Sequence, residues 1–284
     1  MSNLPLNLKA KEMGERQNEL RAVWVFILVT LILSIGVLFL LPGFGGPAIV
    51  VFIPTIMAVI LISLTAGKGQ VRRRLFSQLQ WRISLKWLVI SLGLALALRL
   101  GISLVGLILV PGYQFQPGAF SPLLAMAFLF AAGEEIGWRG FALPTLLWHG
   151  FRPLTASLIL GVPWALVHLP LVLPGMLSEG TPMLAQFLTL LGLSVLMTWI
   201  YLTSGSSLTA AVLLHGGQNM VAILNNGLDA TVSGWLMAAV YGTAALLIIL
   251  FGKGRLGLPD GWRETAAPDD DENVGQFRKL AMKE

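Results

Sequence analysis

Three short stretches of this chain place acidic, imidazole and amide side chains within otherwise apolar sequence. The first contains Glu134 and Glu135, the second ends at His168, and the third contains His215 and Asn219. A carboxylate and imidazoles in apolar surroundings can activate a water molecule, and an imidazole N–H with an amide N–H₂ can stabilise a carbonyl oxygen that becomes negative. The chain has no cysteine and no convincing Ser–His–Asp set. These residue types therefore indicate hydrolysis, with water as the simplest nucleophile.

The two neighbouring acids of the first stretch are predicted to have different roles. On a helix, Glu135 and Arg139 are spaced i, i+4, which suits an ion pair and is equally compatible with a purely structural helix contact. Glu134 points about 100° away from Glu135, so it is expected to lack a local partner and to face a cavity. Gly133 and Gly137 form a GxxxG step, which allows a second helix to come close to the same turn.

The two imidazoles lie on separate apolar segments. Trp164 precedes His168 by one helical turn and is placed to orient its ring, while His215 and Asn219 share one helix face beside two glycines that permit close approach. His149 is expected at an interface, outside the site. Arg99 falls in the middle of an apolar run, where it could pair with one of the acids, contact a substrate or reach towards the membrane surface.

The elements that position these residues are predicted to be membrane-spanning helices. Of the 284 residues 56% are hydrophobic and only 12% charged, and the mean hydropathy is +0.79, values typical of a membrane protein. The formal charge of +5 does not indicate a nucleic-acid partner, because the basic residues lie in short clusters between long apolar runs. The lipid bilayer is therefore the first partner that the sequence predicts.

The fold class expected is all-α, a polytopic transmembrane bundle of about eight spans, since a bilayer core needs roughly 20 apolar residues per helix. Residues 1–21 are predicted to be a polar N-terminal segment, 22–252 the bundle with a catalytic core near 120–225, and 253–284 a polar tail. The basic amphipathic stretch 72–86 is expected at the membrane surface. The runs lie near 22–42, 48–66, 87–110, 120–148, 153–173, 183–203, 207–225 and 233–252.

The distribution of basic residues predicts the orientation. Apart from Arg99 and Arg139, every one of the 19 lysines and arginines lies in the two ends or in the loops that share their side. The positive-inside rule therefore places both termini in the cytoplasm, in what we expect to be the cell membrane.

The three motifs, in this order and each in its own span, resemble the CPBP family, which includes the CAAX prenyl endopeptidases and the bacterial Abi proteins linked to bacteriocin self-immunity. The likeness covers about residues 120–225, and its second motif usually begins with Phe where this chain has Trp164. The resemblance implies an intramembrane endopeptidase acting on a peptide or lipidated protein substrate. It also implies roles for residues of the motifs: Glu134 and His168 would activate water, His215 and Asn219 would form the oxyanion hole, and Glu135 with Arg139 would order the site.

The residues are compatible with a metal-dependent mechanism as an alternative to a metal-free one, and with other functions as alternatives to hydrolysis. Glu134, His168 and His215 would make a plausible Zn²⁺ site, but no HExxH motif and no evident second-shell acid accompany them, so we favour hydrolysis without a metal or other cofactor. The rival functions are an ion- or proton-coupled transporter and a non-catalytic membrane partner of the bacteriocin-immunity type. The residues alone do not identify the substrate or say whether it is prenylated.

Overall fold

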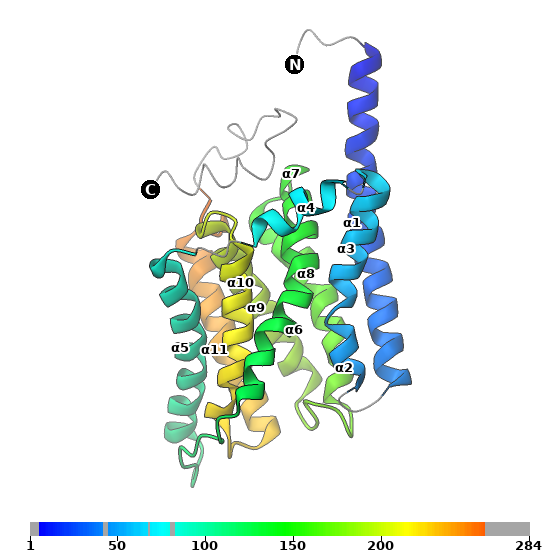
Figure 1. The fold of residues 1–284 in the computed structure, drawn as a ribbon. Helices are drawn as coiled ribbons and strands as arrows, with labels where there is room; N and C mark the ends of the chain where they lie inside the picture. The colour runs from blue at the N-terminus through cyan, green and yellow to red at the C-terminus, as the bar shows by residue number, and fades with distance from the viewer. Residues whose placement is uncertain (1–5, 42–44, 68, 80–82, 259–284) are drawn as a thin grey trace.

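A computed structural model describes residues 6–41, 45–67, 69–79 and 83–258, and this part of the chain is helical without any strand (Figure 1). The predicted all-α class is therefore confirmed. The helices are α1 (Leu6–Leu40), α2 (Gly45–Val50), α3 (Ile53–Thr65), α4 (Gly69–Arg74), α5 (Leu85–Leu109), α6 (Met126–Gly137), α7 (Leu143–Trp148), α8 (Pro153–His168), α9 (Met183–Thr203), α10 (Leu208–Met220) and α11 (Ala230–Phe251). Short 3₁₀ segments are η1 (Phe76–Gln78), η2 (Pro122–Ala125), η4 (Leu169–Val172) and η5 (Val221–Asn225), and η3 (Trp138–Ala142) is a π-helix.

Six segments of the described chain are long and apolar enough to cross a membrane, and each corresponds to one predicted run. They are Gln17–Leu40, Gly45–Thr65, Leu85–Leu109, Pro153–Val172, Met183–Thr203 and Ala230–Phe251. The protein is thus a multi-pass membrane protein, but the count of eight spans is not confirmed.

The two remaining predicted runs, 120–148 and 207–225, are helical but interrupted. The π-helix η3 separates α6 from α7, and α10 is only 13 residues long before the chain tightens into η5. The first run also carries three charged residues, Glu134, Glu135 and Arg139. Both interrupted runs carry predicted site residues. In the first run the interruption is a π-helix, and π-turns occur frequently at functional sites.

The site-bearing helices lie inside the bundle. Helix α6 packs against α3 and α10, and α9 packs against α8, α10 and α11. In α9 67% of the spanning window is buried inside the protein, compared with 28% in α1 and 22% in α11. Figure 1 shows α5 and α11 on one side of these inner helices and α1 with α3 on the other. Large apolar side chains of the outer helices, such as Leu64 and Phe251, are exposed, as expected of surfaces that face lipid.

The close helix approach predicted from glycines is present. A Cβ atom on Gly133 would lie 2.8 Å from the carbonyl oxygen of Val51, and one on Gly137 would overlap the backbone of Pro54 at the start of α3. The hydroxyl of Thr55 donates to the carbonyl oxygen of Gly133 at 2.6 Å. After His215, Gly216 lets α10 approach α6, because a Cβ there would lie 2.8 Å from the Cα of Phe128. These contacts bring the α3, α6 and α10 backbones together around the predicted site.

Basic residues of the described loops gather at one end of the bundle. Helix α4 with its three arginines lies at the same end as α7, the α9–α10 turn and the end of α11, while α2 and the loop after α5 lie at the opposite end (Figure 1). Within the predicted amphipathic stretch, α4 ends at Arg74 and η1 follows, with Leu75 buried and Phe76 exposed. Residues 80–82 of that stretch, the first five residues and most of the predicted tail lie outside the described residues.

Candidate active site

The ion pair predicted from the i, i+4 spacing is present and completely buried. Nη1 of Arg139 lies 3.2 Å from Oε1 and 3.1 Å from Oε2 of Glu135. Nη2 of Arg139 donates to Ser194 Oγ on α9 at 3.0 Å, and Ser194 in turn donates to the carbonyl oxygen of Ser157 on α8. Because Arg139 belongs to the π-helix, this wide turn ties α6 to both neighbouring helices.

Glu135 has a second partner, which the sequence did not predict. Nδ1 of His215 lies 2.9 Å from Oε1 of Glu135, so one carboxylate joins the guanidinium of its own helix to the imidazole of α10. An ionised carboxylate can only accept hydrogen bonds, so Nδ1 carries a proton and Nε2 is the nitrogen left for other partners. The expectation that no acid contacts either histidine from behind is therefore wrong for His215.

Glu134 lies opposite the second motif. Its Oε2 accepts a hydrogen bond from Trp164 Nε1 at 2.6 Å, and Nε2 of His168 lies 3.8 Å from the same oxygen. The prediction that Glu134 has no local partner holds along its own helix, but Trp164 of α8 supplies one. An indole N–H can make this bond and a phenyl ring cannot, so the departure from the usual Phe has a direct structural consequence.

The tautomer of His168 follows from its own helix. Nδ1 lies 2.7 Å from the carbonyl oxygen of Trp164, an acceptor, so Nδ1 carries the proton and the lone pair of Nε2 faces Glu134. The side chain of His168 is 17% exposed, whereas Glu135 and Arg139 are almost completely enclosed. His168 is thus the more accessible side of the cluster.

The indole of Trp164 is at the centre of this cluster. Its ring packs edge to face against His168, with centroids 4.9 Å apart, and against His215 at 5.6 Å. The guanidinium of Arg139 lies 5.2 Å from the same ring centroid, a cation–π distance. Trp164 therefore contacts residues from all three motifs.

Asn219 is less closely tied to the cluster. It lies one turn after His215 on α10, its side chain is exposed, and its Oδ1 accepts a hydrogen bond from Gln218 Nε2 at 2.9 Å. The structure thus brings six predicted residues into direct contact and places Asn219 at the edge of the group. The six are Glu134, Glu135, Arg139, Trp164, His168 and His215.

Two further polar residues lie apart from the cluster. Arg99 forms no ion pair with either acid of α6 in the described structure; its Nε donates to the carbonyl oxygen of Gln218 at 3.1 Å, and its Nη1 to Asn225 Oδ1 at 3.2 Å. Asn225 returns a hydrogen bond to the carbonyl oxygen of Arg99. His149, at the end of α7, contacts the carbonyl oxygen of Thr145. Neither Gln218 nor Asn225 was predicted, because an amide in an apolar run carries no distinctive spacing signal.

The same geometry bears on whether the site could hold a metal ion. Within the described chain, no three His, Asp or Glu residues are grouped so that they could hold a metal ion. The three predicted zinc ligands are not grouped closely enough to hold one ion, although each imidazole contacts a protein oxygen through Nδ1 and keeps Nε2 available.

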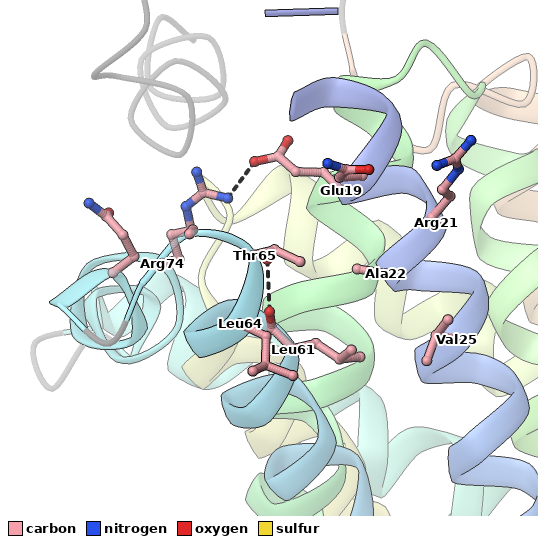
Figure 2. A pocket seen from close by; sticks show the side chains of 11 residues that line it. Glu19, Arg21, Ala22, Val25, Leu61, Leu64, Thr65 and Arg74 are labelled. Atoms are coloured by element: carbon pink, nitrogen blue, oxygen red, sulfur yellow. Dashed lines mark hydrogen bonds and ion pairs between the residues drawn. The ribbon is translucent and has the colours of Figure 1, made fainter. Parts of the chain in front are cut away.

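An open cavity of about 610 Å³ lies elsewhere, between α1, α3 and α4 (Figure 2). Its polar side carries Glu19 and Arg74, whose carboxylate and guanidinium are 2.6 Å apart, and its apolar side carries Val25 and Leu61. No predicted site residue lines this cavity. The candidate site therefore does not coincide with this cavity and consists of the buried polar contacts between Glu134, Glu135 and their partners.

Two comparisons with known proteins concern the part of the chain that carries the site. Residues 116–221 match the family described as type II CAAX prenyl endopeptidase, Rce1-like, and this range contains every predicted site residue. The CAAX prenyl protease 2 of Methanococcus maripaludis is 29% identical over 134 residues, which cover 45% of this chain and 49% of that protein. The chain thus matches about half the length of this curated relative. The resemblance to the CAAX prenyl endopeptidases that the three motifs predicted is confirmed.

Proposed function

We propose that the protein is an intramembrane endopeptidase that hydrolyses a peptide bond of a membrane-associated protein by activated water. The observation that carries this proposal is the contact between the buried carboxylate of Glu134 and the lone pair of His168 Nε2, 3.8 Å apart. A water molecule at a normal hydrogen-bond distance of about 2.8 Å from each atom would lie to one side of the line that joins them and would donate to both. The similarity of residues 116–221 to CAAX prenyl endopeptidases supports the same chemistry.

The mechanism begins with a water molecule that donates one hydrogen bond to Glu134 and one to His168. Both acceptors draw protons from the water, so that its oxygen attacks the carbonyl carbon of the scissile bond while a proton moves to the Glu134–His168 pair. The tetrahedral intermediate then breaks its C–N bond, and the pair returns the proton to the leaving amine. Trp164 keeps Glu134 in position throughout, through its 2.6 Å hydrogen bond.

His215 and Asn219 are proposed to stabilise the oxyanion. Because Nδ1 of His215 donates to Glu135, its Nε2 can donate only when the ring is an imidazolium. Glu135 balances that charge, while Arg139 restrains Glu135 from the other side. The second donor is the amide N–H₂ of Asn219.

The substrate class and the membrane orientation belong to the same proposal. The names of the similar proteins refer to CAAX prenyl substrates. We infer a substrate that reaches the site from the membrane, a peptide or lipidated protein cleaved near its C-terminus. From the positive-inside rule we propose that both termini and the arginines of α4 face the cytoplasm.

The test uses the full-length protein purified in detergent and matched peptides with and without a farnesyl group on cysteine. We expect cleavage detected by mass spectrometry, with one ¹⁸O atom from labelled water in the new carboxylate. Glu134→Gln should abolish turnover, while Glu179→Gln, an exposed acid of the α8–α9 loop, should retain it. A chelator should leave the rate unchanged. Turnover by Glu134→Gln at the wild-type rate would refute the mechanism, and chelator-sensitive activity restored by zinc would refute its metal-free form.

A further inference from the structure

A chain of hydrogen bonds from α11 ends on the amide of Asn219. The hydroxyl of Tyr241 donates to Oε1 of Gln218, and Nε2 of Gln218 donates to Oδ1 of Asn219 at 2.9 Å. Tyr241 is fully buried and Gln218 is 7% exposed, whereas Asn219 is exposed. The chain therefore begins in the protein interior and ends on the predicted oxyanion donor.

The direction of these hydrogen bonds determines what Asn219 can do. With Oδ1 occupied as an acceptor, the exposed end of the amide is its N–H₂ group, which has no hydrogen-bond partner among the described residues. If the chain ran the other way, the N–H₂ group would point back to Gln218 and Oδ1 would face the substrate. A carbonyl dipole in that orientation would repel a developing oxyanion.

The surroundings of Gln218 favour the first direction. Arg99 is buried with 9% exposure; its Nε donates to the backbone carbonyl of Gln218, and its Nη1 contacts the sulfur of Met237, one turn before Tyr241 on α11. Arg99 also interacts electrostatically with the Tyr241 hydroxyl, and a cation attracts the lone pairs of that oxygen and repels its hydrogen. The Tyr241 hydrogen therefore points away from Arg99, towards Gln218 Oε1. This leaves Nε2 as the end of the Gln218 amide that meets Asn219.

We propose that Gln218, held by Tyr241 and Arg99, is a positioning residue that directs the N–H₂ group of Asn219 towards the carbonyl oxygen of the scissile bond. The inference rests on the proposed peptidase function and on the oxyanion role of Asn219. Gln218 itself does not touch the substrate; it acts through Asn219. The role requires one acceptor and one donor on the same side chain, which glutamine supplies and glutamate does not.

The decisive variant is Gln218→Glu, which keeps the size of the side chain and removes its donor. Tyr241 can still donate to one carboxylate oxygen, but the other can only accept, so it draws the Asn219 N–H₂ group away from the substrate. Arg99 Nε donates to the backbone carbonyl of the same residue, so the new carboxylate has a cation close by and folding should not be lost. We expect kcat to fall about 10²-fold, the size of one lost oxyanion donor, with KM and the melting temperature unchanged.

The double variant separates positioning from a structural role. Asn219→Ala should itself lower kcat by about 10²- to 10³-fold, and adding Gln218→Glu to it should change kcat by less than about twofold, because nothing remains to be oriented. Independent effects would instead multiply. Multiplied losses, or wild-type kcat in Gln218→Glu, would overturn the inference while leaving the oxyanion role of Asn219 intact. Full activity of Asn219→Ala would overturn its oxyanion role and the inference while leaving the peptidase function intact, and an inactive wild type would overturn the proposed function itself.

A matched pair of tyrosines tests the outer end of the chain. Tyr241→Phe removes the donor to Gln218, and we expect kcat to fall about fivefold to tenfold, the size of one hydrogen bond. Tyr201→Phe is the control, because Tyr201 is also buried and its hydroxyl donates to a glutamine oxygen, Gln78 Oε1, at 2.8 Å on other helices. It should keep the wild-type kcat. Equal kcat in the two phenylalanine variants would contradict the proposed relay.

Discussion

At the scale of single residues, the two neighbouring acids differ in burial and in contacts, and Glu135 is the more deeply buried of the two. It is completely buried and contacts both Arg139 and His215, whereas Glu134 contacts Trp164 and faces His168. The division of labour predicted from helix spacing is thus extended by the contacts between helices. One acid is placed to hold charge and geometry, and the other is the one that we propose to activate water.

This division predicts different outcomes for the two amide variants. Glu135→Gln leaves the buried guanidinium of Arg139 without its counter-charge, which should cost about 3–5 kcal/mol of unfolding free energy and lower the melting temperature in detergent. The matched control is Glu19→Gln, because Glu19 pairs with Arg74 at a partly exposed site and should lose at most about 1 kcal/mol. Similar melting temperatures for the two variants would show that the buried pair is not structural.

At the scale of elements, the glycines of α6 allow the site to form. The backbone of α6 approaches the start of α3 so closely that Gly133 and Gly137 have no room for a side chain. The carbonyl of Gly133 also receives the Thr55 hydroxyl. Because Glu134 and Glu135 lie between these two glycines, the position of α6 against α3 also sets the position of both acids.

We therefore expect Gly137→Ala to destabilise the bundle. Its Cβ would overlap the backbone of Pro54, which cannot rotate away, and overpacking of this kind costs about 1–3 kcal/mol. Gly93→Ala is the control, because a Cβ at Gly93 in α5 meets no atom within 4 Å and alanine favours a helix. Thermal unfolding in detergent should separate the two variants. An unchanged melting temperature for Gly137→Ala would contradict the tight packing of α6 on α3.

At the scale of the whole molecule, the described loops separate by charge. The end that carries α4 and α7 holds basic residues such as Arg72 and Arg152, and the opposite end holds the loop of Gln116 and the loop of Glu179 (Figure 1). A lipid bilayer with a cytoplasmic side that accepts positive loops accounts for this separation.

Single cysteine probes test the proposed orientation without background, because the chain has no native cysteine. Gln116→Cys and Glu179→Cys, both at exposed positions, should react with an impermeant maleimide on intact cells. Ser77→Cys, exposed at the other end, should react only after the membrane is opened. Protection at Gln116 and Glu179 with labelling at Ser77 would reverse the orientation.

Local spacing was sufficient to predict the membrane class, the all-α fold, the ion pair of Glu135 with Arg139 and the close approach at the paired glycines. These features depend on helix periodicity and on the free energy of transfer into lipid, and both act over a few neighbouring residues. The count of spans was not confirmed, because run length alone does not reveal the π-helix after Gly137 or the early end of α10 at Met220.

Tertiary structure alone decided the partners across helices. Glu134 meets Trp164 30 positions away, Glu135 meets His215 80 positions away, and Arg99 reaches Gln218 119 positions away. Such contacts depend on how α5, α6, α8 and α10 pack and rotate against one another, which no local pattern encodes. The sequence therefore contained the chemical groups of the site. Helix packing determined which nitrogen of each histidine is free to meet water or substrate. It also determined which end of the Asn219 amide is exposed.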